Sequence, residues 1–222
     1  MSTHDVEVEL KYLVADPTAA EWLARAPGFG PFAAGPALPA VRHVDRYLDT
    51  ADGALEGAGY AGRLRATPDG TIVTLKSTRT SAGALQRRSE LEAEAADTLD
   101  PADWPASTPR SVILELCGDR PLVELVAIRQ VRTRRELAAR DATVELSIDE
   151  VEVVAAGAVV DRFTEVEAEL RDGNEERLVE LGGVLETRGL TAAGGSKLER
   201  ARRAAGKAGA RREPPVTEGR ER

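Results

Sequence analysis

The most regular feature of the chain is an alternation of apolar and polar positions. In residues 5–14 (DVEVELKYLV) every second residue is apolar and the residues between are mostly charged. A period of two is typical of a β-strand with one buried and one polar face. Strand-like runs of this kind lie at residues 5–14, 41–49, 60–67, 70–78, 86–95, 129–138, 142–154 and 158–170. The pattern therefore predicts a protein built mainly on antiparallel strands.

The segments between these runs predict turns and helices. Pro68-Asp69-Gly70 is a turn signal that joins two of the strands as a hairpin. A helix is expected after Asp16-Pro17 and should end at Pro27-Gly28, before a loop over residues 29–40 rich in Gly, Pro and Ala. Further helices are expected around Ser111–Cys117, around Leu122–Ile128, over residues 174–188 and from Ser196 onward.

The composition suits one domain with a tail. The chain has 222 residues, 42% hydrophobic and 31% charged, enough to bury a core. Its last stretch combines Gly, Pro-Pro and dense charge without periodicity, which predicts a disordered basic tail or a linker. We expect a folded domain over residues 1–205 and the tail over residues 206–222.

Charge and cysteine content exclude several classes of protein. The net charge is −8, with +4 from Glu199 onward and therefore −12 before it, which argues against a general nucleic-acid binder. The single Cys117 forms no internal disulfide and fits no metal-ligand spacing. The chain shows no secretory signal and no apolar run long enough for a membrane span. We therefore expect a cytoplasmic protein.

The polar faces of the predicted strands are sorted by charge. Residues i, i+2 and i+4 of a strand share a face. The basic sets are Arg63 with Arg65, and Arg132 with Arg134, and the acidic sets are Glu90 with Glu92 and Glu94, Glu145 with Asp149, and Glu165 with Glu167 and Glu169. Glu7, Glu9 and Lys11 share a mixed face, and Thr74 and Lys76 share another.

Two interpretations of these faces are open. For any single strand, solvated charge on the wet side of a sheet is the simpler explanation. Across the set, whole faces of one sign are unfavourable unless something neutralises them, since like charges side by side destabilise a strand pair. Carboxylates can bind a hard divalent cation, and paired arginines can bind phosphate oxygens. The set as a whole indicates a site for a metal–polyphosphate complex.

The ordered motifs resemble those of the CYTH domain, or triphosphate tunnel metalloenzyme, family over about residues 5–203. The matching segments are Glu7-Val8-Glu9-Leu10-Lys11, Tyr47-Leu48-Asp49-Thr50, Arg63-Leu64-Arg65, Thr74-Leu75-Lys76, Arg88-Ser89-Glu90-Leu91-Glu92, Arg132 with Arg134, Glu145 with Asp149, Glu165–Leu170, and Ser196-Lys197. Gly62 departs from the family, which often has an apolar residue there. The basic, proline-containing tail resembles the linker of proteins in which such a domain precedes a helical CHAD domain.

The resemblance implies a fold and an activity. The implied fold is of the α+β class, an eight-stranded antiparallel β-barrel that forms a tunnel with flanking helices. The implied activity is hydrolysis of a triphosphate with Mg²⁺ or Mn²⁺, with inorganic triphosphate as the leading substrate and polyphosphate as a further candidate. The alternatives are an adenylate cyclase, a thiamine triphosphatase, or a binding module for polyphosphate or nucleotides without turnover.

The resemblance also implies roles for particular residues. The phosphate-binding set would be Lys11, Arg63, Arg65, Lys76, Arg132, Arg134 and Lys197. The metal-binding set would be Glu7, Glu9, Glu92, Asp149, Glu165, Glu167 and Glu169. The catalytic set would be Lys76, Arg63, Glu90 and Asp149. His43, Tyr47 and the Asp49-Thr50 pair are expected to be structural.

Overall fold

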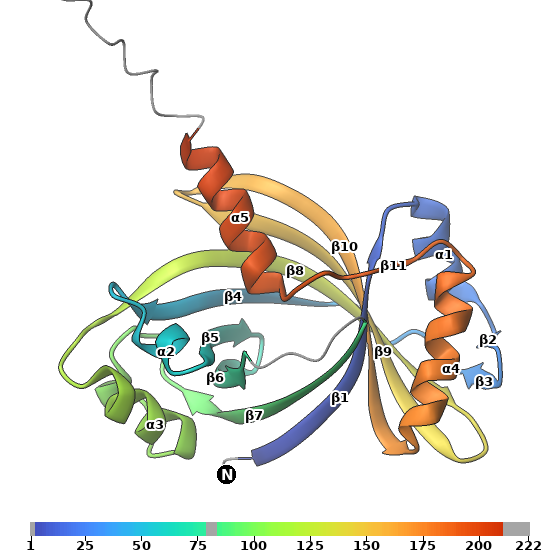
Figure 1. Cartoon of the computed structure of the whole chain (residues 1–222), viewed down its shortest axis with the longest axis horizontal. Coiled ribbons are helices and arrows are strands. Elements are labelled where there is room, and N and C mark those ends of the chain that lie inside the picture. The colour runs from blue at the N-terminus through green and yellow to red at the C-terminus, as the bar shows by residue number, and fades with distance from the viewer. Residues whose placement is uncertain (1–2, 79–83, 211–222) are drawn as a thin grey trace, which may run out of the picture.

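Antiparallel strands close into a barrel in the computed structural model, which describes residues 3–78 and 84–210 (Figure 1). The order around the barrel is β8-β4-β5-β6-β7-β1-β10-β9, and the pairing of β8 with β9 closes the ring. The barrel strands are β1 (Thr3–Val14), β4 (Val41–Thr50), β5 (Tyr60–Thr67), β6 (Gly70–Ser77), β7 (Leu85–Ala95), β8 (Leu122–Ala138), β9 (Ala142–Ala155) and β10 (Ala158–Gly173). The predicted eight-stranded barrel of α+β class is confirmed.

Helices and short strands surround the barrel. They are α1 (Pro17–Arg25), β2 (Gly28–Phe29), β3 (Phe32–Ala34), α2 (Ala54–Gly57), a 3₁₀ turn (Pro101–Asp103), α3 (Thr108–Cys117), α4 (Glu175–Glu186), β11 (Thr191–Ala192) and α5 (Lys197–Ala210). As the capping signal predicts, α1 begins after Asp16, whose side chain accepts a hydrogen bond from the N–H of Thr18.

Three expectations about local structure differ from the structure. The helix predicted around Leu122–Ile128 is wrong, because this segment forms the start of β8 and pairs with β4 and β9. Its apolar run fits a helix or a strand equally well, and pairing with β4 along the segment, joined by β9 from Ala127, decides for the strand. The loop over residues 29–40 contains β3. The α5 helix continues to Ala210, five residues into the predicted tail, and residues 211–222 lie outside the described part.

Two apolar clusters cover the outside of the barrel. On one side Leu10, Leu146 and Val166 pack with leucines of α4 and with Leu23 of α1. On the other side Leu64 and Leu75 belong to a second cluster that includes Trp104 and residues of α2 and α3. Because apolar side chains alternate with polar ones along each strand, this outer packing turns the charged residues inward.

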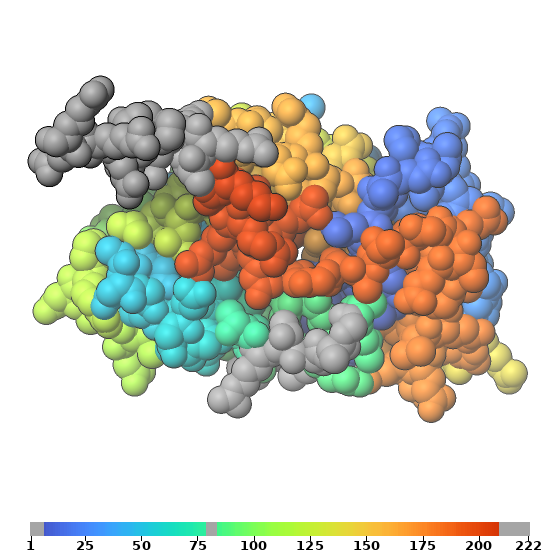
Figure 2. All heavy atoms as spheres, turned by 45° about the horizontal axis from the view of Figure 1, so that its top comes forward, coloured from blue at the N-terminus to red at the C-terminus, as the bar shows by residue number. Residues whose placement is uncertain are grey.

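Helix α5 packs against the inner side of the barrel. Ala201 is fully buried in a third apolar cluster with Ile128 of β8 and Val153 of β9. Figure 1 shows α5 crossing over one side of the barrel, and Figure 2 shows it lying between α2 and the segment that arrives from α4. The helix thereby brings its first residue, Lys197, into the barrel, where that side chain is 6% exposed. Within the described residues, no helix is long and apolar enough to cross a membrane.

Candidate active site in the barrel

The barrel encloses a cavity of ≈ 560 Å³ lined largely by charged side chains. The predicted site residues that line it are Glu7, Glu9, Lys11, Arg63, Arg65, Lys76, Glu90, Glu92, Arg132, Arg134, Glu167, Glu169 and Lys197. Asp149 and Glu165 lie behind this lining, 0% and 1% exposed, and contact Lys197. The structure therefore brings all the predicted site residues to one interior.

Lys197 is the centre of the most buried charge cluster. Its Nζ lies 2.7 Å from Oδ2 of Asp149, 3.0 Å from Oε1 of Glu165 and 2.9 Å from Oε1 of Glu167. Glu167 also accepts from Lys11 Nζ and Arg132 Nη2, each at 2.6 Å. Burial alone would raise the pKa of Glu167, yet the charges of Lys11, Lys197 and Arg132 hold this pKa well below its usual value. Glu167 is thus a fixed anion among three cations.

A second cluster joins β1, β5, β6 and β7. Lys76 Nζ lies 2.8 Å from Oε2 of Glu7 and 2.9 Å from Oε2 of Glu90. Arg63 Nη2 lies 3.7 Å from Oε1 of Glu90 and donates to the Thr74 hydroxyl. Burial and the hydrogen bond with Glu90 raise the pKa of Glu7. The pKa of Glu90 is lowered despite its burial, by that hydrogen bond and by Lys76 and Arg63. The two carboxylates therefore differ in basicity.

Asp45 is a buried member of the site that the sequence analysis missed. It is fully buried on β4 and accepts from Nε and Nη2 of Arg65 at 2.7 and 2.8 Å. Arg63 Nη1 lies 3.8 Å away. Although burial opposes ionisation, these arginines hold the pKa of Asp45 far below its usual value. Its place two residues before Tyr47, on the same strand face, was the signal available in the sequence.

A group of carboxylates gathers on β1, β9 and β10. Glu9 pairs in register with Glu169, and Glu169 pairs with Glu145. Burial raises the pKa of Glu169, Arg171 opposes this, and the charges of Glu7, Glu9 and Glu145 add to it, so that the pKa is about 7. Oε1 of Glu9 is buried and makes no hydrogen bond, and it lies 3.2 Å from Lys11 Nζ. A cation among these side chains would neutralise their repulsion.

The donor set fits a hard divalent cation. Carboxylate oxygens are the ligands that Mg²⁺ and Mn²⁺ prefer. In residues 3–78 and 84–210 no three His, Cys, Asp or Glu side chains are arranged as a ready metal site. The reason is that lysines and arginines contact most of these carboxylates, as Lys76 contacts both Glu7 and Glu90. A phosphate that takes the basic side chains would free the carboxylates for a metal.

Other residues take the structural places expected for them. Asp49 accepts hydrogen bonds from the N–H groups of Leu55 and Glu56 at 2.8 and 3.0 Å, and so caps α2. The Thr50 hydroxyl accepts from the N–H of Ala54. Tyr47 is buried in the apolar cluster beneath α5. These contacts hold α2 against the strands of the site.

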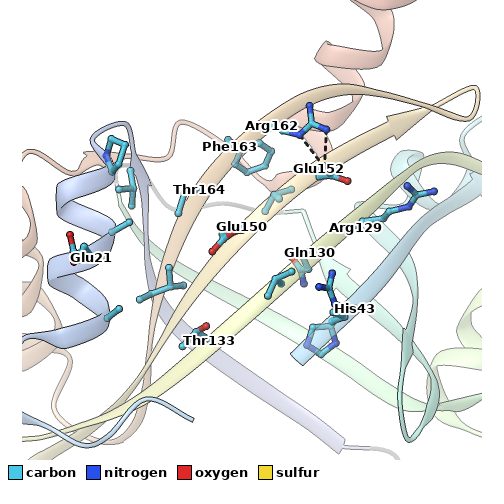
Figure 3. Close-up of a pocket in the computed structure, with 18 of the residues that line it drawn as sticks. Glu21, His43, Arg129, Gln130, Thr133, Glu150, Glu152, Arg162, Phe163 and Thr164 are labelled. Carbon is cyan, nitrogen blue, oxygen red and sulfur yellow. Dashed lines mark hydrogen bonds and ion pairs between the residues drawn. The ribbon is translucent and has the colours of Figure 1, made fainter. Parts of the chain in front are cut away.

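A larger hollow of ≈ 980 Å³ lies outside the barrel, beside α1 (Figure 3). Figure 3 shows polar side chains of β8, β9 and β10 along it, with Arg162 paired to Glu152 at 3.0 Å. His43 lies on its rim. None of the predicted site residues lines it.

Comparisons with known proteins agree with this geometry. The CYTH domain family model matches residues 5–202. HpAC1 from Hippeastrum, a candidate adenylyl cyclase with a dominant triphosphatase activity, is similar over 89% of this chain and 95% of that one, with 22% identity and a TM-score of 0.67. A candidate adenylate cyclase from Bacillus halodurans gives 19% identity and a TM-score of 0.59 over 89% and 97% of the two chains. No curated protein matches the sequence significantly.

Proposed function

The chain belongs to the CYTH family, and we propose that it hydrolyses a triphosphate, inorganic triphosphate first, inside the barrel in a metal-dependent reaction. The observation that supports this most directly is the enclosed cavity, where the predicted cations of β1, β5, β6, β8 and α5 face carboxylates across a few ångströms. Phosphoryl transfer needs charge stabilisation and positioning above all. HpAC1, whose description names a dominant triphosphatase activity, has a similar fold, and this adds support.

The basic side chains would hold the phosphate groups. Arg63, Lys76 and Lys11 enter the cavity from β5, β6 and β1, and Arg132 and Lys197 enter from β8 and α5. Cations on several sides can contact the oxygens of successive phosphates, and the arginines can do so with two parallel hydrogen bonds. Arg65 and Arg132 are already held by an aspartate, since Asp45 accepts from both Nε and Nη2 of Arg65 and Asp149 accepts from the same two atoms of Arg132. We assign Arg65 to the phosphate site through its remaining N–H groups, with Asp45 as the residue that orients it.

The carboxylates would divide into metal ligands and a proton acceptor. The metal set is Glu7, Glu9, Glu92, Asp149, Glu165, Glu167 and Glu169, the residues predicted from the sequence. A bound Mg²⁺ or Mn²⁺ would polarise the phosphoryl oxygens and offset their charge. Glu90 lies beside Lys76 and Arg63, and its pKa is lowered, so it is ionised near neutrality. We assign to Glu90 the task of orienting the attacking water and accepting its proton.

Phosphate release by the purified chain tests the proposal. The assay compares inorganic triphosphate, ATP and thiamine triphosphate with Mg²⁺, with Mn²⁺ and with a chelator. Lys76→Ala removes a cavity cation, and Lys207→Ala is the matched control on the exposed part of α5. We expect release from triphosphate that needs metal, is lost in Lys76→Ala and is retained in Lys207→Ala.

The same assay separates the alternatives. A cyclic nucleotide formed from ATP would favour a cyclase, and preferred release from thiamine triphosphate would favour that narrower hydrolase. Metal-dependent binding of triphosphate without release from any substrate would make the chain a binding module. Activity that persists in Lys76→Ala would contradict the assignment of the barrel cavity as the site.

A further inference from the structure

One cation of the cavity differs from all the others in its surroundings. Arg88 lies on β7, directly opposite Glu7 of β1 in register, lines the cavity and is only 6% exposed. Its Nη2 donates to the neutral side chain of Gln86. Its Nε is buried and has no hydrogen-bond partner. In the described part of the chain, no carboxylate forms an ion pair with this guanidinium.

The cations predicted to bind phosphate are in a different state. Each has at least one carboxylate within ion-pair distance: Lys11, Arg63, Arg65, Lys76, Arg132, Arg134 and Lys197. Glu7 faces Arg88 in the strand register, yet its carboxylate contacts Lys76 at 2.8 Å. Phosphate bound by the paired cations must compete with these carboxylates or use the N–H groups that they leave free, whereas Arg88 has no carboxylate partner among the described residues.

A buried charge without a counter-charge is costly to the folded state. Such a group is retained where it binds an anionic ligand from solution. A guanidinium with a free Nε can donate bidentate hydrogen bonds to phosphate oxygens. We infer that Arg88 is a phosphate-binding residue that anchors the triphosphate before a metal ion is bound. This inference rests on the proposed function, which puts a triphosphate in the cavity, and adds an order of events to it.

Binding of inorganic triphosphate in the presence of a chelator tests the anchor separately from catalysis. The variants are Arg88→Gln and its neighbour Arg87→Gln, which removes an exposed arginine that contacts Glu175 on the outside of the barrel. Calorimetry at low ionic strength should show metal-free binding by the wild type and by Arg87→Gln. We expect Arg88→Gln to bind at least about tenfold more weakly.

Thermal unfolding without ligand separates a binding role from a structural one. Arg88→Gln removes an uncompensated charge, so its melting temperature should equal or exceed that of the wild type. Arg88→Lys keeps the charge but not the planar fork, and should bind with intermediate affinity. Equal affinity of Arg88→Gln and wild type, or no metal-free binding by the wild type, would overturn the anchor. The proposed function is tested apart from this by phosphate release from the wild type with Mg²⁺.

Discussion

The ammonium of Lys197 lies 2.7 Å from Oδ2 of Asp149, which pairs the first residue of α5 with β9 inside the barrel. The two residues are 48 positions apart in the chain. Lys197 also contacts Glu165 and Glu167, and the surrounding carboxylates raise its pKa well above the usual value although burial opposes this. One lysine therefore both neutralises the carboxylates at this end of the cavity and fixes the helix that covers it.

This pairing predicts that Lys197→Met destabilises the fold. The substitution keeps the volume but leaves three buried carboxylates with less positive charge around them. Removing one partner of a buried ion pair costs about 3–5 kcal/mol. We expect a lower free energy of unfolding in urea, with Lys207→Met unchanged. Unfolding of Lys197→Met at the wild-type urea concentration would show that α5 is held by its apolar contacts alone.

Glu169 provides a test of the metal site. Its neighbours Glu7, Glu9 and Glu145 repel its ionised form, so Glu169→Gln should make the metal-free protein equally or more stable near neutral pH. The same variant loses a carboxylate ligand and should bind Mn²⁺ at least about tenfold more weakly, as measured by calorimetry. Glu150→Gln, an exposed position on the outside of β9, is the control. Unchanged Mn²⁺ affinity in Glu169→Gln would remove this residue from the metal set.

His43 should make the fold sensitive to acid. Burial, together with the charges of Arg65 and Arg132, lowers its pKa from 6.5 to about 4. The imidazole of His43 binds a proton less readily in the folded state than in the unfolded chain. The contribution of neutral His43 to the free energy of unfolding is therefore fully present above the pKa that His43 has in the unfolded chain. It is lost as the pH falls toward about 4.

The variant His43→Gln isolates this effect. Urea unfolding at a series of pH values should show its stability improving relative to the wild type as the solution is acidified. The group is half-buried, so solvent screening reduces the size of the effect. A stability difference that does not change between neutral and mildly acidic solution would mean that His43 titrates alike in both states.

Gly62 is expected to be intolerant of a side chain. A Cβ added there would lie 2.8 Å from Cδ1 of Leu55 and 3.1 Å from the carbonyl oxygen of Leu48. Leu55 of α2 fills the space that a side chain at position 62 would need. Gly62→Ala should lower the free energy of unfolding by about 1–3 kcal/mol. Gly57→Ala, with no atom within 4 Å of the added carbon, is the control and should be neutral.

The sequence by itself determined which side chains face the interior of the barrel. Alternation along a strand is a local property of the extended backbone, so Glu9 and Lys11 share a face whatever the rest of the chain does. The apolar residues between them had to be buried on the other side. For this reason the strands and most of the charged residues that line the cavity were predictable, while the closed barrel was implied by the resemblance to the CYTH family.

Only the tertiary structure decided which charges meet. Ion pairs such as Lys76 with Glu7 depend on strand register and on the closure of the barrel, which no local pattern encodes. The same holds for Asp45 beneath Arg65 and for the Arg88 guanidinium, which has no carboxylate partner among the described residues. Pairing with β4 from Leu122 to Ile128 also made this segment a strand, because partners across the sheet outweigh an ambiguous local preference.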